Sequence, residues 1–302
     1  MYSMTALYKV SMKHLISIAG LTVLADVPYK LHPSDSTTRF IQPLKAPVPF
    51  DLTFEIIPVE RLPVRSDVRF TESRRVYVGT GDDAGTYFSS YPNKPPYAFA
   101  SRKTVHSGIL RCEYLPGNEK YMDYARNLIT LMDIEATLLD FGAIILHSSL
   151  ICWKGGGIIF SAPSGMGKST QAELWRQYEG AEILNGDRAA LRKKNGIWHG
   201  YGLPYAGTSG IYRNESAPLK VIVALRQATE NRIRRIAGAE AFSYLYPETM
   251  IHRWDPQFES RAAELLLSLL SEIPVFLLEC RADRGAVEIL KTEIQSLTCE
   301  DN

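Results

Sequence analysis

The hydrophobic pattern divides the chain into a β-rich first part and a mixed second part. Up to about residue 115, short apolar runs alternate or are β-branched and are separated by turn residues, as in residues 54–59, 75–79 and 110–115. Residues 14–25 predict one or two strands, and a secretion signal is the alternative. From residue 118 to 140, apolar residues recur every three or four positions, which predicts a helix. We therefore expect a β-rich recognition or accessory domain over residues 1–117 and a second domain over residues 118–302.

The second part alternates apolar strands with amphipathic helices, which predicts an α/β fold. Apolar, β-branched runs over residues 142–153 and 157–160 are joined by a glycine turn, which is typical of a hairpin. Two further strands are predicted at residues 219–225 and 274–280, and two amphipathic helices at residues 261–273 and 283–294. The whole chain is thus predicted to be an α/β protein with a β-rich N-terminal domain.

The most informative stretch is Ser161-Ala-Pro-Ser-Gly-Met-Gly-Lys-Ser-Thr170, which follows the second strand of the hairpin and opens a helix. A strand, a glycine loop, Lys-Ser and a helix form the context that a phosphate-binding P-loop requires. Unpaired N–H groups and a partial positive charge at a helix N-terminus attract phosphate. Glycines let those N–H groups approach phosphate oxygens where a Cβ would clash. The expected nucleotide-binding residues are Ser164, Gly165, Met166, Gly167, Lys168, Ser169 and Thr170.

Two of these residues have distinct expected roles. Lys168 would reach the β- and γ-phosphates, and the Ser169 hydroxyl would ligate Mg²⁺. Ala162 stands where the regular motif has its first glycine, and alanine costs little there if its φ is negative. The alternative is a Gly/Ser/Pro turn that precedes a lysine by chance.

Two side chains outside this loop are further candidates for chemistry. Asp187 ends the strand predicted after the loop's helix, where an acidic residue commonly holds Mg²⁺ or its water, and an ordinary Asn-Gly-Asp turn is the alternative. His147 lies in the strand of residues 142–153. A lone histidine in an apolar strand is commonly a core residue, but His147-Ser-Ser places three polar groups in succession there, and buried polar groups need partners.

A second glycine-rich loop spans residues 202–216. It is long for a simple connection, and long loops in compact domains are often functional. Its arginine could clamp a phosphate through bidentate hydrogen bonds, or the loop could be a solvated surface loop. The candidate substrate-loop residues are Gly207, Ser209, Gly210, Arg213 and Glu215.

Composition narrows the class of protein. The net charge of the 302 residues is +1, so no bulk electrostatic argument favours nucleic acid or a membrane surface as a partner. The apolar runs stop well short of a membrane span. The four cysteines are scattered without a C-x-x-C pair, which fits reduced thiols better than a disulfide frame or a zinc site. We therefore expect a cytoplasmic protein that binds neither nucleic acid nor membranes.

Three segments together resemble a known family over roughly residues 140–295. Ile-Leu-His-Ser-Ser, then Ser-Ala-Pro-Ser-Gly-Met-Gly-Lys-Ser-Thr after a glycine turn, then Ile-Leu-Asn-Gly-Asp-Arg is similar to the C-terminal domain of HPr kinase/phosphorylase. That family shares a mixed-sheet P-loop fold with the nucleotide core of phosphoenolpyruvate carboxykinase. The resemblance implies a protein-serine kinase that uses ATP and Mg²⁺, with His147 at the active site.

The chain departs from the family at one position. The acidic pair that ends the family's strand, one acid for Mg²⁺ and one as base, reads Gly186-Asp187 here. Either Asp187 holds the metal while another group is the base, or Asp187 serves both roles. His147 is a candidate base because an imidazole can accept a proton near neutral pH. The candidate catalytic residues are therefore His147, Asp187 and Lys168, and the candidate metal ligands are Ser169 and Asp187.

The resemblance also shapes the expected partner. Some relatives resemble kinases of a serine at the end of a ribosomally made precursor peptide, and residues 1–115 do not resemble the usual HPr kinase N-terminal domain. We expect a peptide or protein with an acceptor serine, or a small-molecule hydroxyl. Relatives often form hexamers, which implies a homo-oligomer. An alternative, favoured by Gly186, is a nucleotide-binding regulatory or assembly protein without phosphotransfer. A carboxykinase-like enzyme would need a Lys, His and Asp metal site that the sequence does not convincingly supply.

Overall fold

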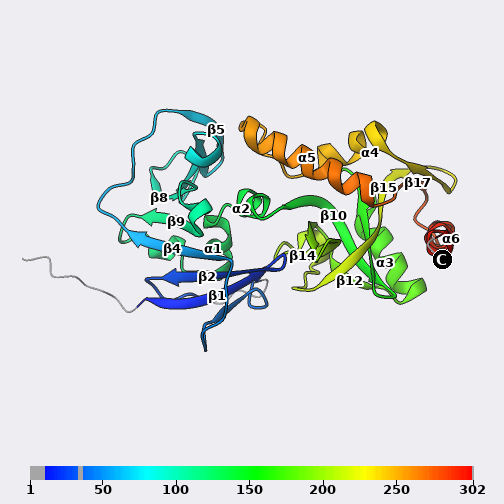
Figure 1. The fold of residues 1–302 in the computed structure, drawn as a ribbon, viewed down its shortest axis with the longest axis horizontal. Coiled ribbons are helices and arrows are strands. Elements are labelled where there is room, and N and C mark those ends of the chain that lie inside the picture. The colour runs from blue at the N-terminus through cyan, green and yellow to red at the C-terminus, as the bar shows by residue number, and fades with distance from the viewer. Residues whose placement is uncertain (1–10, 33–36, 301–302) are drawn as a thin grey trace, which may run out of the picture. The chain divides into compact units, whose positions relative to one another are not determined.

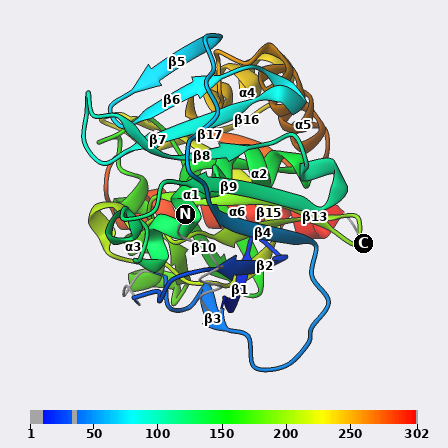
Figure 2. The same cartoon turned by 90° about the vertical axis from the view of Figure 1, so that its left-hand side faces the viewer.

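The computed structural model describes residues 11–32 and 37–300 (Figure 1 and Figure 2). The chain divides into two compact units. The first holds the residues up to Ile134 together with Arg253–Phe258, and the second holds Glu135–His252 and the residues from Glu259 onward. The sequence placed this boundary after residue 117. The residues from 118 to 134 belong to the first unit instead. Backbone hydrogen bonds between His32 and both Asp123 and Ala125 tie this segment to that unit.

The described residues of the first unit form one mixed sheet of nine strands, and the β-rich pattern of the sequence is confirmed there. The strands are β1 (Met12–Ile18), β2 (Leu21–Val27), β3 (Ile41–Pro43), β4 (Leu52–Pro58), β5 (Val68–Glu72), β6 (Arg75–Val78), β7 (Gly85–Ser89), β8 (Pro96–Ser101) and β9 (Ile109–Tyr114). Their order is β3-β1-β2-β4-β9-β8-β7-β6-β5. In β2, every second side chain from Leu21 to Val27 is buried, because successive side chains point to opposite faces of a sheet.

The prediction of a single helix over residues 118–140 is wrong, because two short helices occupy that stretch. They are α1 (Ala125–Leu131) and α2 (Ile134–Asp140). Asp133 stands between them with φ +48°, a left-handed conformation that a right-handed helix cannot contain. Its carboxylate accepts a hydrogen bond of 3.1 Å from the Thr86 hydroxyl, which holds the break in place. The periodicity of apolar residues therefore identified helical segments but not the interruption.

The second unit contains eight strands, and the predicted hairpin and the predicted later strands are all present. They are β10 (Ala143–Trp153), β11 (Gly156–Ser161), β12 (Glu182–Asn185), β13 (Arg188–Lys194), β14 (Ile197–Gly202), β15 (Ser216–Gln227), β16 (Arg232–Ile236) and β17 (Val275–Cys280). β10 and β15 are long, and each changes partners along its length. As a result β10, β13, β14, β15 and β11 close a ring of paired strands, and β17 and β16 extend the sheet beyond β15.

Helices cover the strands of the second unit on both sides. They are α3 (Lys168–Glu179), α4 (Gly238–Leu245), α5 (Pro256–Glu272) and α6 (Arg284–Glu300). α3 and α6 share a buried cluster with β11, β15 and β17. Phe160, Trp175 and Leu290 are fully buried in it. Figure 1 shows α4 and α5 along the other side of these strands. No helix in the part of the chain that the structure describes is long and apolar enough to cross a membrane.

Candidate active site

The register of β10 brings the predicted site segments together. His147 pairs with Arg188 at the start of β13, and the next residue, Ser148, pairs with Ser161 at the end of β11. Ser161 opens the glycine loop, and Arg188 directly follows Asp187. His147 therefore lies where β10 leaves one neighbour and joins the other, beside both the loop and the acidic turn.

The connection between β11 and α3 has the strand, glycine loop and helix order expected from the sequence. Gly165 and Gly167 have φ of +81° and +103°, which favours glycine because other residues rarely adopt left-handed conformations. A Cβ at either position would meet no protein atom within 4 Å. Glycine is therefore favoured at both positions by the backbone conformation and not by lack of space. Ala162 is buried and is not among the residues with positive φ, so alanine is tolerated at the motif's first position.

Lys168 lies across this loop and is buried. Its Nζ donates hydrogen bonds to the carbonyl oxygens of Ala162, at 2.7 Å, and Pro163, at 3.2 Å. Burial lowers the pKa of Lys168, while the negative charges of Glu248 and Asp187 act in the opposite direction. A poorly hydrated ammonium group near a helix N-terminus is suited to an anionic ligand.

The other loop residues differ in exposure. Ser169 and Thr170 are exposed in the first turn of α3, and Ser164 and Gly165 are exposed in the loop. Met166 is half-buried and packs against the hydrophobic cluster beneath α3. The loop therefore combines an apolar anchor with polar groups that remain accessible to a ligand.

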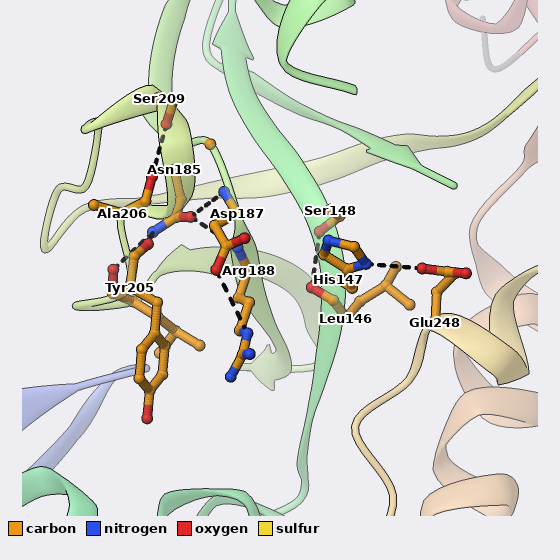
Figure 3. A network of polar contacts seen from close by, with 12 residues as sticks. Leu146, His147, Ser148, Asn185, Asp187, Arg188, Tyr205, Ala206, Ser209 and Glu248 are labelled. Atoms are coloured by element: carbon orange, nitrogen blue, oxygen red, sulfur yellow. Dashed lines mark hydrogen bonds and ion pairs between the residues drawn. The ribbon is translucent and has the colours of Figure 1, made fainter. Parts of the chain in front are cut away.

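Asp187 lies in a tight turn between β12 and β13 that Asn185 organises. The Asn185 side chain is fully buried, and its Oδ1 accepts the backbone N–H groups of Asp187 and Arg188 at 2.8 and 2.9 Å. Its Nδ2 donates to the carbonyl oxygens of Leu203, at 2.7 Å, and Tyr205, at 3.1 Å. Asn185 therefore fixes the acidic turn and ties the start of the 202–216 loop to it (Figure 3). In the sequence Asn185 is marked only as a turn signal before Gly-Asp, and its side-chain bonds become visible only in the fold.

The hydroxyl groups around Gly186 hold the two predicted metal ligands in one region. Ser169 Oγ donates to the Gly186 carbonyl oxygen at 3.4 Å, and Ser149 Oγ donates to the same oxygen at 3.3 Å. Gly186 directly precedes Asp187, so the Ser169 hydroxyl is bonded to the turn that carries Asp187. The Asp187 side chain is 27% exposed, and Arg188 Nε lies 3.5 Å from its Oδ2.

The three successive polar residues of β10 all have partners, as their burial requires. Ser148 Oγ donates to the Leu146 carbonyl oxygen, and Ser149 Oγ donates to that of Gly186. His147 Nδ1 lies 2.9 Å from Glu248 Oε2. The polar triplet is therefore a bonded part of the site.

Glu248 is a functional candidate that the fold adds to those of the sequence. Its side chain is 11% exposed, and it belongs to a 3-10 turn, Tyr246–Glu248. The following Thr249 pairs with Leu146, and the N–H of Met250 donates to the Ile145 carbonyl oxygen at 2.9 Å. This pairing along β10 aims Glu248 at His147 (Figure 3). No local motif marks Glu248, because its role arises from a contact across about a hundred residues.

The predicted substrate-loop residues fall into two groups. Gly207 lies against the acidic turn, since a Cβ on it would be 2.8 Å from Asp187 Oδ1, and Gly210 has φ +68°. Arg213 Nη1 instead pairs with Glu182 at 2.9 Å and with Glu215 at 3.6 Å. Glu182 begins β12 and Asp187 follows its end, so at about 3.3 Å per residue the Glu182 position is more than ~10 Å from Asp187 along the chain. The Arg213 guanidinium is thus directed toward the start of β12, away from Asp187, although the backbone N–H of Arg213 donates to the Leu184 carbonyl oxygen at 2.9 Å.

Ser209 explains why a second acid is absent beside Asp187. A Cβ on Gly186 would clash with Ser209 Oγ and would lie 2.7 Å from Ser209 Cβ. Ser209 is itself fixed, since its Oγ donates to the Ala206 carbonyl oxygen and accepts the N–H of Ile211. The 202–216 loop therefore fills the space that a side chain at position 186 would need.

These residues fit a nucleoside triphosphate with Mg²⁺. Lys168 is a desolvated cation at the N-terminus of α3, where the first backbone N–H groups have no helical partner. The Ser169 hydroxyl and the partly exposed Asp187 carboxylate are oxygen ligands of the kind that Mg²⁺ prefers.

Comparisons with known proteins leave the family open. No protein-family model matches the chain, and no curated protein matches it. Among solved structures, the Hpr(Ser) kinase/phosphatase from Coxiella burnetii is similar with a TM-score of 0.30 and 11% identity, over 52% of this chain and 91% of that chain. So distant a likeness assigns neither a family nor an activity to this chain.

Proposed function

We propose that the protein is a kinase that uses ATP and Mg²⁺ to phosphorylate a serine-type hydroxyl of a peptide or protein. The supporting observation is the convergence of Lys168, Asp187 and the His147–Glu248 pair where β10 changes partners, next to the end of β11. Phosphoryl transfer depends on positioning and charge neutralisation more than on covalent chemistry by the protein. A cation, a metal-binding carboxylate and a proton acceptor around one loop supply those requirements.

The glycine loop and α3 would hold the nucleotide. Backbone N–H groups of residues 164–170 and the Lys168 ammonium group would bind the phosphates. Ser169 and Asp187 would hold Mg²⁺, which when bound neutralises charge on the phosphate oxygens. Gly207, which packs against Asp187, would help to keep that carboxylate in place.

His147 would act as the general base. Because Nδ1 faces the Glu248 carboxylate, the proton of a neutral ring belongs on Nδ1, and Nε2 is left as the acceptor. Nε2 would take the proton from the serine hydroxyl as its oxygen bonds to the γ-phosphorus and the bond to the nucleoside diphosphate breaks. Glu248 would stabilise the resulting imidazolium ion.

A second candidate is a nucleotide-binding regulatory protein that transfers no phosphate. The packing of Ser209 against Gly186 favours it, because this packing excludes the second carboxylate that the resembled kinases carry. In such a protein the His147–Glu248 pair would be a structural contact between β10 and the 246–250 segment.

Mass spectrometry after incubation with Mg²⁺-ATP and pools of acceptors distinguishes these candidates. The pools are HPr, serine-ended peptides, and free serine with nucleosides. The kinase predicts one added phosphate on one acceptor, lost in Asp187→Asn and retained in a control, Asp82→Asn, whose carboxylate is exposed and bonded to His106. Bound ATP with no modified acceptor in any pool would instead support the regulatory protein. Normal turnover by Asp187→Asn would remove Asp187 from the mechanism.

A further inference from the structure

A cavity of about 600 Å³ lies in the second unit at the amino ends of its parallel strands, whereas the glycine loop follows the carboxyl end of β11. It is bounded by Gly156 at the start of β11, by Leu219 and Lys220 in the first part of β15, and by Pro274 just before β17. These three strands are parallel, and the glycine loop follows the other end of β11. With five residue steps of about 3.3 Å each, β11 separates the cavity from the loop by roughly 17 Å.

The lining combines an apolar floor with a cationic rim. Trp153, Leu219 and Ile294 are buried lining residues. Lys154, Lys220 and Arg235 are exposed cations of the same lining. Among the described residues of the lining the one carboxylate is that of Glu272, and it is already paired with Lys193. The cavity therefore carries an excess of positive charge over an apolar surface.

Two of the three rim cations form no ion pair with a described residue. On β16, Arg232 pairs with Glu230 and Arg234 pairs with Glu240, whereas no carboxylate of a described residue pairs with Arg235 or Lys220. An unpaired arginine beside an apolar cavity is suited to a bidentate bond with a carboxylate.

Two local features place the lysines at the rim. Gly156 makes room for the Lys220 stem, because a Cβ there would lie 2.5 Å from Lys220 Cγ. Lys154 Nζ lies 4.7 Å from the centre of the Trp153 ring, a cation–π contact that keeps this ammonium group beside the aromatic wall.

We infer that this cavity binds a small organic carboxylate with an aromatic or other apolar body. The volume lies within the range of about 300–1,000 Å³ that small-molecule sites occupy. Arg235 and Lys220 would bind the carboxylate, and Trp153 with its apolar neighbours would bury the body. The site shares no residue with the glycine loop or the acidic turn, so it is independent of the proposed kinase activity.

Calorimetric titration of the full chain with 2-naphthoate tests this inference, and the uncharged 2-naphthamide serves as comparison. We expect saturable binding of one naphthoate per chain and binding of the amide that is weaker by about tenfold or more, because the charge-assisted bonds are lost. Lys220→Gln combined with Arg235→Gln should weaken naphthoate binding by a similar factor. Arg232→Gln, on the same strand but outside the lining, should leave it unchanged.

Several results would overturn the assignment. They are the absence of saturable binding at millimolar naphthoate, equal affinity for the acid and the amide, and an unchanged affinity in the double variant with an unaltered melting temperature. Displacement of naphthoate by ATP would also overturn it, since it would place the probe at the glycine loop. Failure of phosphotransfer, in contrast, would leave the naphthoate titration unaffected.

Discussion

At the scale of single residues, the candidate site is built from charges that are partly removed from water. Lys168 is held by two carbonyl oxygens, and Glu248 is nearly buried beside His147. Removing one member of such a bonded pair leaves a buried charge or polar group without its partner. Single substitutions at these residues are therefore expected to have large and specific effects on activity or stability.

Replacing Glu248 by glutamine should lower kcat for phosphotransfer by about 10- to 100-fold, because the amide cannot stabilise an imidazolium ion at His147. The affinity for ATP should change little, since Glu248 is not among the proposed phosphate-binding groups. Steady-state kinetics and nucleotide titration separate the two quantities. Glu240→Gln, an exposed carboxylate bonded to Arg234, is the matched control. A kcat equal to that of the wild type would make the His147–Glu248 contact structural.

Lys168 predicts a pH dependence of stability in the protein without nucleotide. Burial lowers the pKa of Lys168 in the folded protein below the ordinary value of 10.5. At a pH between these two pKa values, the unfolded chain therefore binds more protons than the folded protein. The free energy of unfolding therefore rises with pH in that window through this residue. Urea unfolding between pH 7 and 10 should show the wild type gaining stability relative to Lys168→Met as pH rises. A constant difference between the wild type and Lys168→Met across this range would contradict the prediction.

At the scale of elements, the turn after β12 and the 202–216 loop form one bonded assembly. Asn185 joins the two through its side chain, and the N–H of Gly186 donates to the Ile211 carbonyl oxygen at 3.2 Å. The loop therefore determines which side chains the acidic turn can carry.

Gly186→Ala should destabilise the protein by about 1–3 kcal/mol, the usual effect of overpacking, because its Cβ would clash with Ser209. Combining it with Ser209→Gly, which removes the opposing atoms, should recover part of this loss. A double-mutant cycle by urea unfolding measures the coupling between the two positions. Additive effects would show that Ser209 does not limit position 186.

At the scale of the whole molecule, the two units are interleaved in sequence. Residues 253–258 lie late in the chain but belong to the first unit. Trp254 stacks on Phe70 with ring centres 4.2 Å apart, and the Asp255 carboxylate accepts the N–H of Gly81 at 2.9 Å. A fragment that ends before this segment would lack part of the first unit's packing. The homo-oligomer implied by the family resemblance stays a prediction.

Trp254→Ala should therefore destabilise the first unit by about 2 kcal/mol, through lost aromatic packing. Hydrogen exchange should accelerate in β6 and β7 while β10 and β11 keep their protection. Tyr91→Ala removes an aromatic side chain that is 62% exposed and should change neither region. Equal loss of protection in both units would mean that they unfold together.

The sequence by itself determined the local features of this protein. Alternating or β-branched apolar runs predicted several strands of each unit, and the order of strand, glycine loop and helix around Lys168 follows from neighbours in the chain. Both are properties of short windows, in which side-chain period and backbone preference act directly. The helix over residues 118–140 failed because Asp133 adopts a left-handed conformation that its hydrogen bond to Thr86, far away in the sequence, helps to hold.

Only the tertiary structure decided which groups meet at the candidate site. The exchange of partners along β10 places His147 beside the glycine loop, and a turn about a hundred residues later supplies Glu248. The packing of Ser209 opposes a side chain at position 186, and the ion pair with Glu182 directs the Arg213 guanidinium toward the start of β12. Contacts between distant segments depend on strand register and loop packing, which no short window of sequence contains.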